Sequence, residues 1–73
     1  MRNSEMRMRI ELNGKAHLVD GGATLAQLVD SMQLTGKAVA VAVNRQVVPS
    51  HEWAGYLLTE ADRVDVVRAI GGG

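Results

Sequence analysis

The feature that most constrains the fold of this chain is a helical stripe set among segments with the period of strands. Within residues 25–32 the apolar positions fall at i, i+3, i+4 and i+7, one face of an amphipathic helix: Leu25, Leu28, Val29 and Met32. Thr24 precedes this stripe and Gln27 follows it by three residues, the spacing of a capping box. We expect Gly36 to end the helix through a left-handed C-cap. Because one helix cannot cover both faces of a sheet, the sequence predicts an α+β fold with one open sheet face.

The first strand segments predict a β-hairpin. Residues 6–12 alternate between apolar and charged side chains, the pattern of a half-buried strand. Asn13-Gly14 follows, the dipeptide that best tolerates positive φ at both central positions of a hairpin turn. Residues 16–19 then form the returning strand.

The strand segments after the helix complete a mixed sheet of four to five strands. Residues 39–43 alternate Val and Ala, so the Val side chains should face the helix, and Ala40 and Ala42 the open side. Later elements are a turn at 44–46, a short strand at 47–48 stopped by Pro49, a short helical turn capped by Ser50 and running to Trp53, a polar turn at 59–63 and a strand at 64–67. Counting along this last strand places Val67 and Ala69 on the open face with the two alanines. The predicted order is β-β-α-β-β-β with a short helix before the final strand.

Composition limits the classes of function that a chain of 73 residues can have. Lys and Arg total 8 and Asp and Glu total 8, so the formal net charge is zero, which argues against nucleic acid bound by bulk electrostatics. The absence of Cys excludes a disulfide framework and a thiolate metal site, and suits a reducing cytoplasm. No apolar run approaches the length of a membrane span. We expect an N-terminal extension at 1–7, one domain at 8–70 and a flexible tail at 71–73.

Several other sequence features are better explained by a structural role than by a catalytic or ligand-binding role. Asp20–Thr24 lacks the Lys of a phosphate-binding loop, so it predicts a turn followed by an N-cap. His17 and His51 lie in different elements and are expected at the surface without a metal, and Trp53 is expected to cover the edge of the core. The remaining acidic residues of the second half are expected to form a solvated face: Glu52, Glu60, Asp62 and Asp65.

The last five residues are Ala-Ile-Gly-Gly-Gly, which alone would fit a frayed end, a linker or a cloning remnant. Together with what precedes them, VAVNRQVVPSHEWAGYLLTEADRVDVVRAIGGG resembles the second half of the ThiS family, the ubiquitin-like sulfur carriers of thiamine biosynthesis. The cues are the Val/Ala strand into Asn44, Val48-Pro49, Trp53, the acidic turn before Val64 and the terminal glycines. The resemblance extends over residues 8–73.

The chain departs from the family pattern at two positions. Ala61 precedes Asp62 where the family usually has Gly-Asp, and we expect a turn of another type there rather than a strained positive φ. At position 71 the family often has a residue with a side chain, whereas this chain has Gly71. The last two glycines of the family pattern, Gly72 and Gly73, are present.

The resemblance implies a β-grasp fold and a carrier that is itself no enzyme and binds neither cofactor nor metal. An E1-like adenylating enzyme would use ATP to activate the carboxylate of Gly73, which as an anion is a poor electrophile. A cysteine desulfurase or another persulfide protein would supply sulfur, and thiazole synthase would receive it from the C-terminal thiocarboxylate. From the composition we expect no nucleic acid or membrane partner and a cytoplasmic location.

Physical properties of the tail and of the open face fit such a carrier. Gly71, Gly72 and Gly73 lack Cβ atoms and can thread a narrow channel. Four extended residues from Ile70 span about 13 Å, enough to enter a partner's active site. The flat, small-residue patch predicted on the open face is a candidate docking surface for that partner: Ala40, Ala42, Val67 and Ala69.

Two alternatives remain open at this point. The small subunit of molybdopterin synthase shares the tail chemistry and differs in the acceptor of the sulfur. A β-grasp binding module, such as one that contacts RNA, would have incidental glycines, although zero net charge and few aromatic residues argue against it.

Overall fold

The computed structural model describes residues 7–34 and 36–68. Its elements are, in order, β1 (Arg7–Leu12), β2 (Lys15–Asp20), α1 (Leu25–Ser31), β3 (Val39–Val43), β4 (Gln46–Val48), the 3₁₀ helix η2 (Ser50–Gly55) and β5 (Arg63–Arg68). This order confirms the predicted one, including the short helix before the last strand. The terminal residues to which Ala69, Gly71, Gly72 and Gly73 belong lie outside the described residues.

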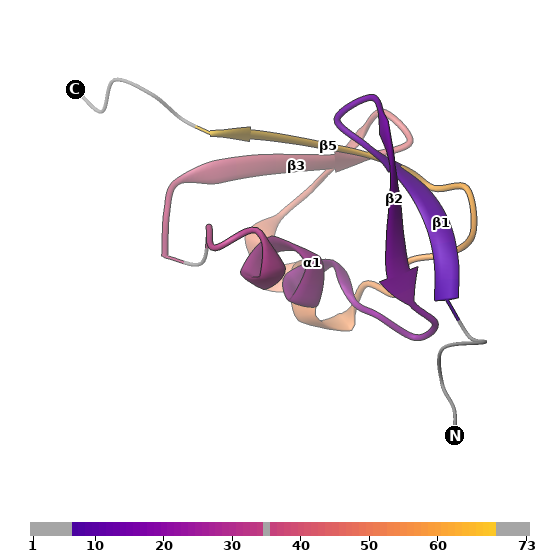
Figure 1. Cartoon of the computed structure of the whole chain (residues 1–73). Coiled ribbons are helices and arrows are strands. Elements are labelled where there is room, and N and C mark those ends of the chain that lie inside the picture. Colours follow the sequence, from indigo (N-terminus) through magenta and orange to yellow (C-terminus); the bar gives the residue numbers. More distant parts are fainter. Residues whose placement is uncertain (1–6, 35, 69–73) are drawn as a thin grey trace.

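The strands form one mixed five-stranded sheet in the order β2-β1-β5-β3-β4. β5 runs parallel to β1, with Glu11 opposite Arg63 and Leu12 opposite Val64, whereas the other neighbours are antiparallel. The last strand of the chain is therefore the central strand of the sheet (Figure 1). Because both its neighbours are strands, the chain leaves the sheet from its middle and not from an edge.

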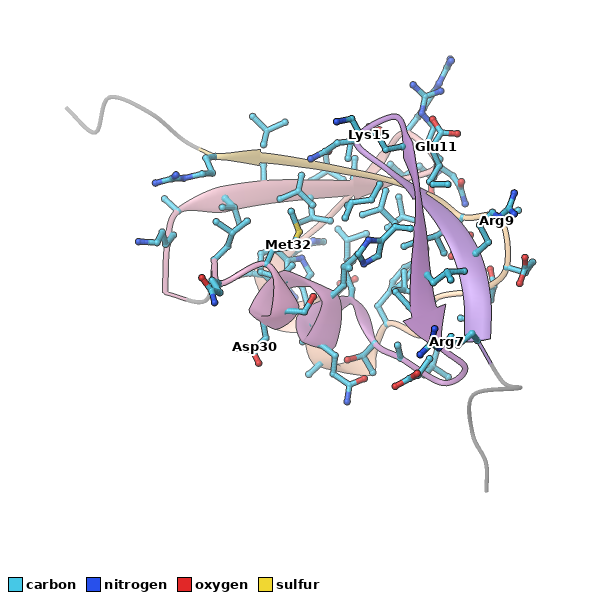
Figure 2. All side chains as sticks on the ribbon, in the orientation of Figure 1. Arg7, Arg9, Glu11, Lys15, Asp30 and Met32 are labelled. Carbon is cyan, nitrogen blue, oxygen red and sulfur yellow. The ribbon has the colours of Figure 1, made fainter. Side chains whose placement is uncertain are left out.

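The core lies between α1 and one face of the sheet, as the helical stripe predicts. Figure 1 shows α1 on one side of β3 and β5, with the other side of these strands uncovered. The buried apolar side chains are Ile10, Leu25, Leu28, Val29, Val41, Val43, Val48, Leu58 and Val64. Met32, the last member of the stripe, is half-buried and lies between the end of α1 and β3 (Figure 2). The alternation of β3 is also confirmed, because its Val side chains face the core.

The start of α1 follows the prediction and its end does not. Thr24 Oγ1 accepts the Gln27 N–H at 3.2 Å and Gln27 Oε1 accepts the Thr24 N–H at 2.9 Å, which completes the capping box. The left-handed residue after the helix is Gln33, with φ of 63°, and not Gly36. The Gln33 N–H donates to Asp30 O and the Leu34 N–H to Val29 O, the pattern of a Schellman motif. Because the apolar stripe ends at Met32, the left-handed residue that ends the helix is the next one along the chain. Gly36 lies in the turn that follows.

Side-chain capping was also wrongly predicted for the short helix. Pro49 occupies the N-cap position of η2, and no side chain caps it, so Ser50 is not the cap. Trp53 is half-buried against the core, and its indole N–H donates to Val48 O at 2.8 Å. The prediction that Trp53 covers the edge of the core is confirmed.

Two hairpin turns have positive φ at both central residues. Asn13 and Gly14 have φ of 50° and 83°, as the Asn-Gly pair predicts. Asn44 and Arg45 have φ of 52° and 73°, so this turn needs only two residues and Gln46 already belongs to β4. Arg45 is a β-carbon-bearing residue in the left-handed region, a conformation that sequence patterns assign to Gly or Asn.

The turn before β5 contradicts the expectation for Ala61. Its φ is 71°, so the backbone keeps the left-handed conformation that a Gly would accept freely. The Ala61 N–H donates to Arg9 O at 2.8 Å, and the Asp62 N–H donates to Thr59 O at 3.1 Å. These hydrogen bonds hold the turn against the local preference of Ala.

The acidic residues do not form one solvated face. Asp62 is 8% exposed, and its carboxylate accepts the Thr59 N–H at 2.9 Å and the Asn44 Nδ2–H at 3.1 Å. Glu52 is exposed beside His51, and Glu60 is exposed while it accepts the backbone N–H of Arg9, whereas Asp65 is half-buried. The prediction missed Asp62 because its partner Asn44 is distant in the sequence.

Candidate functional site

The residues predicted for the open sheet face are neighbours across β3 and β5. Ala40 lies opposite Val67 and Ala42 lies opposite Asp65 in the antiparallel pairing. Directly opposite residues of an antiparallel pair share a face, so these side chains point away from α1. The described members Ala40, Ala42 and Val67 therefore share one face, and their role in docking stays a prediction.

Val47 extends this surface and was not predicted to belong to it. Val47 lies opposite Ala42 on β4 and is 74% exposed, compared with 62% for Val67. Because Val48 points into the core, the period of two along β4 turns Val47 outward, a signal that the sequence does carry. We call Ala40, Ala42, Val47 and Val67 the outer apolar patch.

Charged side chains border the outer apolar patch on the side of β1. Arg63 Nε lies 3.9 Å from Glu11 Oε2 and 3.8 Å from Asp65 Oδ2. Figure 2 shows Glu11 near the turn that joins β1 to β2. Exposed ion pairs of this kind stabilise a fold by little. Their contribution here is to give the patch a polar rim next to the strand that leads into the tail.

The start of β5 is held by the turn between β3 and β4. The Asn44 N–H donates to Arg63 O at 2.7 Å, and the Arg63 N–H donates to Asn44 Oδ1 at 3.0 Å. With the additional hydrogen bond to Asp62, this one side chain fixes two successive residues where the strand begins.

The later part of β5 is held by the other hairpin turn. The Asn13 N–H donates to Val64 O at 2.9 Å, and Asn13 Oδ1 accepts the Val66 N–H at 2.8 Å. The sequence marks Asn13 and Asn44 as turn residues through their tolerance of positive φ. It carries no signal for their side-chain partners, which depend on how distant strands assemble.

Other candidate sites are weaker. Within residues 7–34 and 36–68, no group of three or more His, Cys, Asp or Glu side chains is placed to hold a metal ion. His51 is exposed as predicted, whereas His17 is half-buried and lines an open hollow between β2 and α1. No helix in the described part of the chain has the length and apolar character needed to cross a membrane.

The architecture, a mixed five-stranded sheet under one helix with the last strand at its centre, is that of the β-grasp class. Residues 7–73 match the profile of the ThiS family. The chain therefore belongs to the ThiS family, the sulfur carrier proteins of thiamine biosynthesis, which act as carriers and not as enzymes.

Individual relatives agree with this assignment. The sulfur carrier protein ThiS of Escherichia coli K12 is 29% identical over 66 residues, which cover 90% of this chain and 100% of that protein. A thiazole synthase of Magnetococcus marinus is 38% identical over 66 residues, 90% of this chain but only 20% of that protein. The chain likewise spans 20% of a thiazole synthase of Paramagnetospirillum magneticum, with 27% identity.

A solved structure supports the fold. The crystal structure of the thiamine biosynthesis protein ThiS from Geobacter metallireducens superposes with a TM-score of 0.76. The match covers 90% of this chain and 100% of that one at 23% identity, and it confirms the predicted α+β β-grasp architecture.

Proposed function

We propose that the sulfur is carried on the terminal carbonyl carbon, at Gly73. The Gly73 carboxylate attacks the α-phosphorus of ATP on an E1-like adenylating enzyme, which forms an acyl adenylate and releases pyrophosphate. A persulfide sulfur then attacks the carbonyl carbon and expels AMP, leaving an acyl disulfide. A thiol reduces this disulfide to the thiocarboxylate and is itself oxidised. Thiazole synthase finally takes the sulfur for the thiazole ring.

One observation carries this proposal: in this member of a family of sulfur carriers, the central strand of the sheet is the one that precedes the terminal glycines. β5 is the central strand, ends at Arg68, and precedes a chain end whose last three residues are Gly. Residues without Cβ leave the carbonyl carbon open to attack from both faces and can enter a narrow channel. The folded domain stays outside that channel, because its sheet and helix are packed around one core and are together too wide to enter it.

The partners follow from the chemistry and from the relatives. Proteins that bear the name thiazole synthase contain a stretch similar to this chain, which supports thiazole synthase as the acceptor. ATP belongs to the adenylating partner, and a cysteine desulfurase or another persulfide protein is the sulfur donor. Because the proposed reduction of the acyl disulfide needs a thiol, and the cytoplasm keeps thiols reduced, we place the carrier in the cytoplasm.

We further propose that partners grip the outer apolar patch together with Ala69. An exposed apolar surface with a polar rim is typical of protein interaction sites. Val67 is exposed and lies one residue before the end of β5, so an enzyme bound there is close to the start of the tail. The binding should be weak, since ordering a Gly-rich tail costs entropy, and weak binding suits a carrier that moves between enzymes.

Intact mass spectrometry tests the thiocarboxylate directly. After incubation with ATP, an adenylating enzyme and a persulfide donor, the C-terminal fragment should gain the mass of one oxygen-to-sulfur exchange at Gly73. A variant with one Ala appended after Gly73 is the matched control. It should fold normally and lose activation by at least about tenfold, because the carboxylate is displaced by one residue, about 3.3 Å. Equal activation of both chains, or no acyl adenylate on the unaltered chain, would contradict the proposal.

A further inference from the structure

We propose that Asn13 is a positioning residue for the C-terminal tail, an inference that rests on the proposed function above. Its backbone and side chain hold β5 past the point where pairing with β1 stops. The paired residues of β1 and β5 are Glu11 with Arg63 and Leu12 with Val64. Beyond Leu12 the chain turns away into the hairpin, and β5 would lose support on that side.

Asn13 supplies that support through its main-chain and side-chain groups. Its N–H donates to Val64 O at 2.9 Å, and its Oδ1 accepts the Val66 N–H at 2.8 Å. The side chain thus takes the place of a backbone acceptor that the hairpin cannot provide. Its φ of 50° brings this about, because the left-handed conformation keeps Asn13 beside β5 while the chain reverses.

The hydrogen bond lies where it can set the direction of the tail. Val66 is two residues before Arg68, the last described residue, and β3 alone pairs with Val67 and Arg68 among the described strands. The five residues after Arg68 start from the end of β5, so a tilt of that end displaces the point from which the tail leaves the domain. Displacements of about 1 Å can already slow a reaction that depends on position.

The turn at Asn44 provides an internal comparison. Asn44 has a φ of 52° and also holds β5, but at its first residue, through Arg63 and Asp62. Both turns stabilise the fold, but of the two asparagines only Asn13 holds a residue near the end of β5, where the tail begins. Loss of the Asn13 side chain should therefore affect tail activation more than loss of the Asn44 side chain.

The experiment compares Asn13→Gly, Asn13→Asp and Asn44→Gly with the unaltered chain, at a temperature where all are folded by circular dichroism. Gly accepts the turn conformation but lacks the acceptor, whereas Asp keeps an oxygen for the Val66 N–H. In Asn13→Gly, hydrogen exchange of the Val66 amide should rise about tenfold, since one hydrogen bond is lost. For adenylation, kcat should fall about 3- to 10-fold with KM for the carrier within about twofold. Asn13→Asp should restore both values, and Asn44→Gly should keep kcat.

Several results would overturn the inference. It fails where Asn13→Gly leaves either the Val66 exchange or kcat unchanged, where only KM changes, or where Asn44→Gly lowers kcat equally. It also fails where Asn13→Asp behaves like Asn13→Gly. A failure of the unaltered chain to be adenylated would overturn the proposed function and the positioning role together. Normal adenylation with an unaffected Asn13→Gly variant would overturn the positioning role alone.

Discussion

At the scale of single residues, Ala61 holds a backbone conformation that its side chain disfavours. With φ at 71°, its Cβ crowds the carbonyl oxygen, which costs about 1–2 kcal/mol for an L-residue. Gly removes this cost but loses about 0.5–1 kcal/mol more conformational entropy on folding. We therefore expect Ala61→Gly to raise the free energy of unfolding by about 0.5–1 kcal/mol, as measured by urea denaturation.

Ala16→Gly is the matched control for this substitution. Ala16 is also exposed, but it lies within β2, where the backbone is extended. Replacing it with Gly should lower the free energy of unfolding by about 0.5–1 kcal/mol, since entropy is lost without relief of strain. Equal losses in both variants would show that the left-handed conformation of Ala61 carries no cost.

At the scale of elements, local periodicity was enough to predict the strands, the helix and their order. The stripe of α1 and the Val/Ala alternation of β3 each arise from neighbours in the sequence, so pattern and structure agree. The end of α1 was missed because Gln33 adopts a conformation that its residue type does not favour. The uncovered face of the sheet was predicted from the sequence. The burial of Asp62 was not, because it depends on a hydrogen bond with Asn44, which is distant in the sequence.

Asp62 is expected to be the residue that fixes the segment between η2 and β5. Its carboxylate accepts hydrogen bonds from the Thr59 N–H and the Asn44 side chain while it is almost fully buried. Asp62→Ala would leave both donors without this partner and should lower the free energy of unfolding by about 1–3 kcal/mol. Glu52→Ala, at an exposed position, should change it by no more than about 0.5 kcal/mol. A loss no larger than that of Glu52→Ala would contradict this role of Asp62.

At the scale of the whole molecule, the fold combines a packed face with an open one around a single central strand. The covered face contains the core, while the open face carries the outer apolar patch beside the end of β5. A small domain has no room for a separate docking module, so one sheet must provide both stability and recognition. The terminal residues themselves give no local signal of a function. Their meaning depends on the strand from which they emerge and on the family to which the chain belongs.

The separation of the packed face from the open face predicts that a substitution can weaken partner binding and leave the fold intact. Ala42 points to the open face from β3, so Ala42→Arg can extend its side chain into solvent and should leave the melting temperature within a few degrees. In a complex the same guanidinium would be desolvated without a partner, and affinity for the adenylating enzyme should fall at least about tenfold.

The matched control is Ala16→Arg, which adds the same side chain to the same face at β2. Ala16 lies opposite Glu11 on the edge strand β2, so β1 and the polar rim separate it from the outer apolar patch, and its substitution should leave the affinity within about twofold. Titration calorimetry with the purified adenylating enzyme measures both variants. Unchanged affinity in Ala42→Arg would remove the outer apolar patch from the interface, and equal losses in both variants would extend the interface across the whole open face. A selective loss would place the enzyme next to β5, where a bound domain can deliver its last carboxylate while the core stays intact.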